Sequence, residues 1–356
     1  MKYWWMSLIL VGLCLSGCTA KRKVEIIEPT FMEEIQTECP VYLSIATAGN
    51  FSDAPYGKVF QSCLDDLNAS GLFDVSLYEN GIMGEDAQLI RAVQNGTISV
   101  TMMSPSGQTT VVPGASLLDI PWLFPDSETY QNFLNESGMR FLEPLYAEKG
   151  LVLLGISAHD YRYLTSNRPI YSVEDLQGLK IRIQDNICHR ILWESLGAEP
   201  VPIDFHELYM ALYNGTVDAQ ENPYVVAKSK RLYEVQDYIV ETGHLPTVYV
   251  YVMNQEQWNQ MTAEHQEMLK AEIQRYISEV TEQTPKIVGE LRQWLTETKG
   301  MTLLTPDEAF QKELLAGRQA VVDYIKTQIG ETEVELYLSL ADSYLQLTRA
   351  RTARTE

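Results

Sequence analysis

The chain has 356 residues, of which 45% are hydrophobic and 10% aromatic, a composition typical of a globular protein long enough for two domains. Its formal net charge of −21 argues against binding to phosphate backbones, so nucleic acid is not expected as a partner. The same charge repels anionic ligands at long range, so any anion site must be built locally from a few shielded cations.

The first twenty residues are typical of a targeting segment. Lys2 supplies a positive charge, and the apolar run 4–15 is too short to span a bilayer reliably. Small residues precede Cys18 in a pattern similar to a bacterial lipobox. We therefore expect residues 1–17 to be a lipoprotein signal peptide. The alternative is an ordinary secretory peptide that is cleaved near Ala20.

The lipobox interpretation places the mature protein outside the cytoplasm. Cys18 would carry the lipid, and residues 18–40 would tether the chain to the membrane. Of the other cysteines, Cys39, Cys63 and Cys188 remain after cleavage, and an odd number leaves at least one thiol free. A disulfide between Cys39 and Cys63 and separate reduced thiols both remain open.

Strands and helices alternate in the first part of the mature chain. Strands are expected at 41–48, 73–78 and 98–103, and helices at 56–67 and 86–94. This β-α-β-α-β order predicts a parallel sheet with crossover helices. The exit of the first strand, at 47–50, is where α/β folds place ligands, which makes Thr47 a candidate.

Further along the chain, the expected strands are short and form a second group. They are predicted at 151–156, 161–165, 180–183, 217–220, 237–241, 248–253 and 301–304. One long helical pattern covers 262–299, and Pro285 should kink it because proline lacks an N–H. The next stretch is helical up to Leu345, with a break near Gly330, and a polar tail covers 348–356.

The two groups of strands predict an α/β protein with two lobes. We expect residues 41–160 to form mainly the first lobe and residues 161–255 mainly the second. Residues 256–347 would supply the long helix and the C-terminal helices that span both lobes.

Motifs for cofactor chemistry are absent from the sequence. It contains no GxGxxG or Walker loop, no paired HxxxH or HExxH, and no CxxC, so neither a nucleotide, a cofactor nor a metal is expected. Cys188 and His189 are adjacent, but neighbours on a helix point apart and cannot act as nucleophile and base. An enzyme is therefore not expected.

The stretch 176–186 carries the clearest sign of a binding site. Ile181 and Ile183 should lie on one face of a short strand, with Lys180, Arg182 and Gln184 on the other. A helical run follows, so a guanidinium lies just before a helix N-terminus, and both features attract an anion. The alternative is an exposed arginine paired with a surface carboxylate.

Two further polar positions lie at the ends of predicted strands. Arg162 follows Tyr161, and Asn222 follows Glu221 in a run that ends in proline. A guanidinium holds a carboxylate through two parallel hydrogen bonds, and an asparagine amide adds a donor. These positions and Arg182 predict a site for an organic anion.

Four motifs in this order resemble those of one known family: 175–182 (DLQGLKIR), 196–200 (LGAEP), 207–212 (ELYMAL) and 215–223 (GTVDAQENP). The chain is similar, from about 41 to 330, to the substrate-binding proteins of tripartite ATP-independent periplasmic (TRAP) transporters, the DctP-like family. The resemblance implies a two-lobed, periplasmic-binding-protein-like fold with a long lobe-spanning helix. It also implies closure around a small organic acid and its delivery to TRAP membrane subunits driven by an ion gradient.

The resemblance also implies roles for single residues. Arg182 would form the main salt bridge to the ligand carboxylate, Arg162 and Asn222 would assist, and Phe205 would pack on the ligand. Gln184 lies in a polar run that can bind hydroxyl groups. The ligand can therefore be a sugar acid as well as a dicarboxylate.

Glu221 and Thr47 complete the candidate site. The run 104–107 lacks the charged contacts of the family branch that binds sialic acid, which argues against a large amino sugar. The alternatives for function are the solute receptor of an ATP-driven importer and a tethered ligand-binding sensor.

Overall fold

The computed structural model describes residues 39–52 and 54–352. The expected signal peptide at 1–17, the lipidation site at Cys18 and nearly all of the tether lie outside the described residues. Within the described part, no helix combines the length and the apolar character that a membrane span requires.

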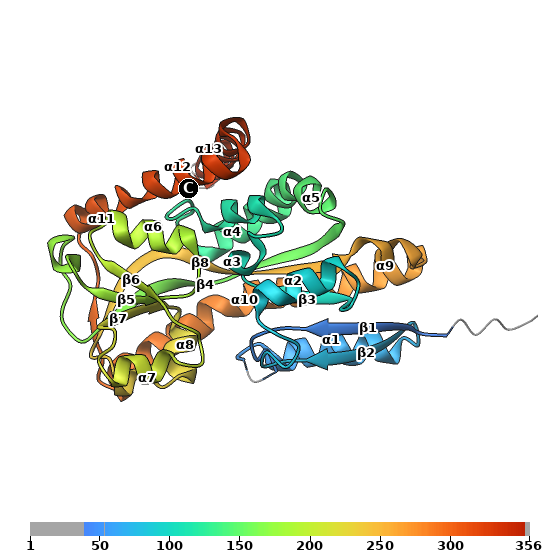
Figure 1. The fold of residues 1–356 in the computed structure, drawn as a ribbon, viewed down its shortest axis with the longest axis horizontal. Coiled ribbons are helices and arrows are strands. Elements are labelled where there is room, and N and C mark those ends of the chain that lie inside the picture. Colours follow the sequence, from blue (N-terminus) through green and yellow to red (C-terminus); the bar gives the residue numbers. More distant parts are fainter. Residues whose placement is uncertain (1–38, 53, 353–356) are drawn as a thin grey trace, which may run out of the picture. The chain divides into compact units, whose positions relative to one another are not determined.

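The described chain contains a single nine-stranded sheet with helices on its faces (Figure 1). The strands follow the order β2-β1-β3-β8-β4-β7-β5-β6, and β9 pairs with β8. β1 runs parallel to β2 and β3, and β5 runs parallel to β6 and β7, which confirms the expected crossover topology. The strands are β1 (Val41–Ala46), β2 (Phe73–Tyr78), β3 (Val100–Met103), β4 (Leu151–Ser166), β5 (Lys180–Ile183), β6 (Glu199–Pro202), β7 (Ala219–Asn222), β8 (Tyr238–Asn254) and β9 (Thr302–Leu304).

Two long antiparallel strands connect the two ends of the sheet. The sequence predicted four short strands here, but the structure joins them in pairs into β4 and β8. The end of β8 at 250–253 pairs with β3, whereas the end of β4 at 163–166 pairs with β7. Each long strand therefore belongs to both groups of strands, and the predicted lobe boundary at 160/161 falls inside β4.

The pairing of β4 with β8 is irregular at the centre. The register shifts between Leu153 and Gly155, between Ala158 and Tyr161, and between Arg162 and Leu164. Such bulges re-aim side chains and are frequent near functional sites. The buried polar residues of this stretch interrupt the apolar pattern, which is why the sequence predicted a break between two strands.

The helices agree with the sequence in most places. The short segments at 105–108 and 255–260 and the strand at 199–202 are not predicted from the sequence, because each is too short for a period to show. The helices are α1 (Gly57–Ala69), α2 (Asp86–Gln94), α3 (Pro105–Gln108), α4 (Ser127–Phe133), α5 (Met139–Ala147), α6 (Ile187–Ser195), α7 (Leu208–Tyr213), α8 (Tyr224–Ser229), α9 (Gln255–Gln260), α10 (Ala263–Gln293), α11 (Glu308–Leu315), α12 (Gly317–Ile329) and α13 (Glu331–Thr352).

The long helix is confirmed. α10 begins after Thr262, whose side chain caps it, and continues through Pro285 to a π-helical turn at Trp294–Thr298. It contacts the long strand β4 and two helices, α1 and α8, which belong to the first and second groups of elements (Figure 1).

The C-terminal helical stretch ends later than the expected Leu345. α13 extends to Thr352, with acidic residues in its first turn and Arg349 and Arg351 in its last, a distribution that suits the helix dipole.

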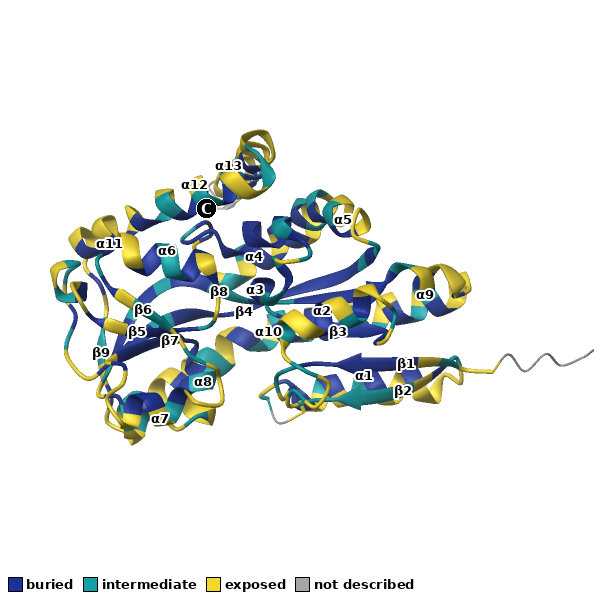
Figure 2. Cartoon of the chain, in the orientation of Figure 1, coloured by how far each residue is buried: buried dark blue, intermediate teal, exposed yellow. Residues whose placement is uncertain are grey.

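Helices cover both faces of the sheet and bury the long strands, as expected for an α/β protein (Figure 2). One apolar cluster joins strands to α2, α4, α5, α6, α12 and α13, and a second joins strands to α1, α9 and α10. Cys63 and Cys188 are buried in these clusters and Cys39 is exposed. All three are free thiols, which answers the question that the sequence left open.

Candidate functional site

Arg182 lies on β5 with its side chain buried. Its neighbours Ile181 and Ile183 are buried too, because helices cover both faces of the sheet, and Arg182 itself is only 2% exposed. Its Nε donates to the Ile203 carbonyl at 2.8 Å, and its terminal nitrogens have no partner among the described residues. Burial lowers the pKa of Arg182 to about 10, against the attraction of Glu221. The guanidinium is thus charged, desolvated and unpaired, unlike a surface arginine with a carboxylate partner.

Arg162, unlike Arg182, is paired with a buried carboxylate. From the irregular part of β4, its Nε donates to Glu221 Oε2 at 2.5 Å, and its Nη2 donates to Glu221 Oε1 at 2.9 Å. The same Nη2 reaches the Glu221 carbonyl and, at 3.1 Å, Asn222 Oδ1. Glu221 is fully buried on β7, and burial alone would raise its pKa. Arg162 and His189 instead hold the pKa of Glu221 well below its usual range.

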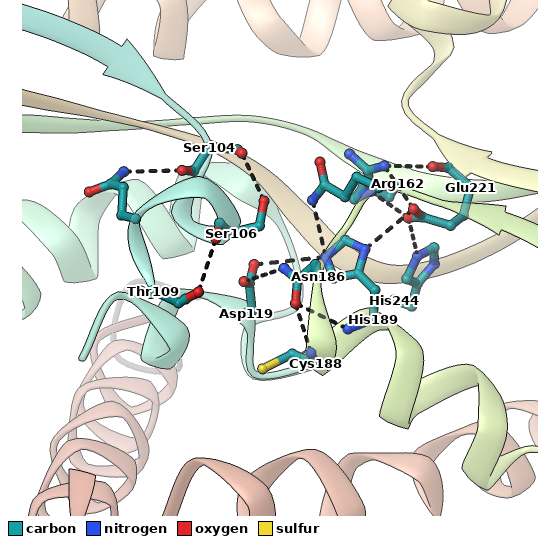
Figure 3. Close-up of polar contacts among 12 residues, drawn as sticks. Ser104, Ser106, Thr109, Asp119, Arg162, Asn186, Cys188, His189, Glu221 and His244 are labelled. Atoms are coloured by element: carbon teal, nitrogen blue, oxygen red, sulfur yellow. Dashed lines mark hydrogen bonds and ion pairs between the residues drawn. The ribbon is translucent and has the colours of Figure 1, made fainter. Parts of the chain in front are cut away.

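Two histidines complete the shell around the Glu221 carboxylate (Figure 3). His189 Nδ1 lies 3.3 Å from one oxygen and His244 Nε2 lies 3.1 Å from the other. Burial would lower the pKa of His189, but Glu221 and Asp119 on its two sides raise it. Burial lowers the pKa of His244 despite Glu221. These surroundings therefore favour the charged form of His189 more than that of His244.

The N-terminus of α6 is occupied by its own cap. Asn186 Oδ1 accepts the N–H groups of Cys188 and His189, at 2.7 and 3.3 Å, and Asn186 Nδ2 donates to Asp119 Oδ2 at 2.8 Å. Asn186 thus takes two of the free donors at this helix end, and attraction of a ligand anion by the remaining ones stays a prediction. Gln184 lies at the edge of the cluster, with its Nε2 3.5 Å from His189 Nε2.

Phe205 lies in the loop before α7, which begins at Leu208. The ring is 39% exposed, and the ammonium of Lys230 lies 4.1 Å from its centroid. Burial and then the charge of Arg182 lower the pKa of Lys230. Lys230 is therefore within electrostatic reach of Arg182, and it connects Phe205 to the same region.

The hydrogen bonds that Thr47 makes in the described chain do not connect it to this cluster. Its Oγ1 accepts the N–H of Gly49 at 3.2 Å, and its backbone bonds to Tyr78 and Gly81. Its side chain makes no hydrogen bond to the Arg162–Glu221 group within the described chain. A ligand contact for Thr47 stays a prediction.

The sequence did not predict Asp119, His189, His244 or Lys230 as site residues. Asp119 did carry a signal, because a lone carboxylate inside the apolar run 117–124 must find a partner when it is buried. The other three lie on separate elements, so no spacing in the sequence connects them.

A surface hollow of about 410 Å³ lies elsewhere, between α5, β4 and α10. Its lining includes Arg140, Glu143 and Gln274, and it includes none of the predicted site residues. The convergence of buried charges at Glu221 therefore defines the candidate site better than the hollow does.

The family model of bacterial extracellular solute-binding proteins, family 7 (DctP), matches residues 55–328. Among curated relatives, a solute-binding protein of Roseobacter denitrificans is 30% identical over 264 residues, which cover 73% of this chain and 79% of the relative. The ectoine/5-hydroxyectoine-binding periplasmic protein of Ruegeria pomeroyi is 28% identical over 217 residues, which cover 60% of this chain and 64% of that protein.

Solved structures show the same fold. The sugar acid binding protein of Advenella mimigardefordensis in complex with galactonate superposes with a TM-score of 0.78 at 24% identity, over 86% of this chain and 99% of that one. A TRAP periplasmic solute-binding protein of Shewanella oneidensis with bound succinate gives 0.76 at 22% identity, over 85% and 99%.

Proposed function

The chain belongs to the DctP family of bacterial extracellular solute-binding proteins, and on this basis we propose that it is the receptor of a TRAP importer. The receptor binds a small organic acid, closes around it and delivers it to membrane subunits that an ion gradient drives. It acts by binding and release, without turnover of the acid.

The observation that carries this proposal is the state of Arg182. Its terminal nitrogens have no partner among the described residues, although the side chain is almost fully buried. A buried, unpaired charge is costly, so such a group is retained where a ligand supplies the partner. A carboxylate fits the planar guanidinium through two parallel hydrogen bonds.

Arg162 has a different role in the proposal. Glu221 already neutralises it, and the three contacts of its Nη2 fix the plane of the guanidinium. Nη1 makes no hydrogen bond to the described residues, so it remains able to donate to the ligand beside Arg182. Asn222 holds Arg162 in this position and donates from its own amide to Gln220 Oε1 at 2.6 Å.

The acid is a sugar acid or a dicarboxylate. Relatives with the same fold hold galactonate and succinate. Phe205 offers an apolar face to the carbon skeleton, and Gln184 offers an amide to hydroxyl groups. We therefore propose for Phe205 and Gln184 the same ligand contacts that the sequence led us to expect.

The first test identifies the ligand and its charge. Mass spectrometry of small molecules released from the purified, denatured protein is expected to find an organic acid. Thermal-shift and calorimetric titration should then show that the acid binds and that its methyl ester or amide does not, because the neutral analogue cannot pair with Arg182. Equal affinity for the neutral analogue would contradict an anion site.

The second test concerns Cys18, which lies outside the described residues. We expect the Cys18→Ser precursor to lose its lipid, so that fractionation finds the protein released or its precursor retained. Calorimetry should give an unchanged affinity in solution, whereas uptake of the acid by cells falls. Membrane retention of a variant that has been cleaved to its mature length would disprove the anchor, and normal uptake would show that the anchor is not needed for transport.

A further inference from the structure

Lys230 stands out among the cations near the candidate site. It lies just after α8, half-buried, with its ammonium over the ring of Phe205 at 4.1 Å. It makes no salt bridge or hydrogen bond to the described residues. Burial and the neighbouring charge of Arg182 both lower its pKa, so its surroundings disfavour a second positive charge.

The acids of this region are mostly committed to other cations. Glu221 pairs with Arg162, and His189 lies between Glu221 and Asp119. Asp204 attracts Arg182, but it is exposed and makes no ion pair in the described chain. Arg182 donates to the Ile203 carbonyl, and Lys230 lies over the ring of Phe205 two residues further along the same loop. Both cations thus meet one loop, and within the described residues neither has a carboxylate in contact.

Lys228 on the same helix provides a comparison. Its ammonium also lies over an aromatic ring, that of Trp294, at 5.0 Å. Trp294 lies in the π-helical turn after α10, whereas Phe205, the ring under Lys230, lies two residues after Ile203, whose carbonyl accepts from Arg182 Nε. A stacked lysine is therefore ordinary in this segment, and the feature specific to Lys230 is that its aromatic partner belongs to the loop that Arg182 contacts.

We propose that Lys230 is a second ligand-binding cation, which with Arg182 makes the site selective for acids that carry two anionic groups. This inference rests on the proposed function and narrows the substrate class. Arg182 holds one carboxylate through its planar fork. Lys230, a point charge on a flexible stem with three donors, attracts the group at the other end, while Phe205 holds that stem beside the carbon skeleton.

The experiment compares acids that differ in one charge. Calorimetry measures succinate against succinamate and D-galactarate against D-galactonate, for the wild type, Lys230→Met and Lys228→Met. Methionine keeps an unbranched apolar stem over the ring and removes only the charge. Melting temperatures establish that the variants fold, and Lys230→Gln serves as a second neutral variant.

In at least one pair, the wild type is expected to bind the dianion at least tenfold more tightly than the monoanion. Lys230→Met should weaken binding of the dianion by tenfold or more and change the affinity for the monoanion by no more than about twofold. The difference corresponds to the loss of one charge contact. Lys228→Met should leave both affinities unchanged.

Equal affinity of the wild type for both members of each pair would overturn the inference, as would an equal loss for both acids in Lys230→Met. Arg182-dependent binding of monocarboxylates alone would also overturn it, and the proposed function would stand. If no acid bound at all, the proposed function itself would fail.

Discussion

Replacement of Arg182 by alanine is expected to weaken binding of the organic acid by roughly 30- to 5,000-fold, which corresponds to about 2–5 kcal/mol. The guanidinium is buried, and its terminal nitrogens have no partner in the described chain, so the ligand carboxylate is its expected counter-charge. The variant should fold with unchanged or higher stability, because removal of a desolvated, unpaired cation relieves a cost in the ligand-free protein.

Replacement of Arg182 by lysine distinguishes the contribution of the positive charge from that of the planar guanidinium. Arg182→Lys keeps the positive charge but loses the fork that binds a carboxylate at two points, so we expect a loss of affinity close to that of alanine. Arg190→Ala, a partly exposed arginine on α6, is the matched control and should bind normally. Calorimetry measures all three, and wild-type affinity in Arg182→Lys would rule out bidentate binding.

The fold was largely predictable because its outer elements keep clear periods. β2 and α2 match their predicted bounds, and α10 follows its apolar stripe through Pro285. The centre was not predictable, because β4 and β8 bury polar groups along their length. His159 and Asp160 look like a loop in the sequence, whereas in the structure they lie within β4.

The candidate site, like the fold, was predictable from the sequence only in part. Their places at predicted strands drew attention to Arg162, Arg182 and Asn222, and the structure adds that Glu221 neutralises Arg162 while Arg182 has no such partner among the described residues. This distinction cannot be predicted from the sequence, because it depends on which strand lies beside which. β7 carries Glu221 to Arg162 through pairing of 219–222 with 163–166, across more than fifty residues of chain.

Glu221→Gln is expected to lower the free energy of unfolding by about 3–5 kcal/mol, because it breaks a fully buried charge pair from one side. The glutamine amide would bring N–H donors to face Arg162, His189 and His244, which already point donors at this position. Urea unfolding followed by circular dichroism measures the change. Glu290→Gln, which alters an exposed pair with Lys286 on α10, is the control and should change stability little.

The pH dependence of this effect follows from the direction of the shift. The pKa of Glu221 lies well below its unfolded value, so its carboxylate stabilises the fold above the unfolded pKa, and this contribution is lost as the pH falls toward the folded pKa. The stability difference between wild type and Glu221→Gln should therefore be full near neutral pH and shrink in acid. Arg162→Met added to Glu221→Gln should recover part of the loss, since it removes the charge left unpaired. If the single variant unfolded like the wild type at neutral pH, the Arg162–Glu221 pair would not be what holds β4 to β7.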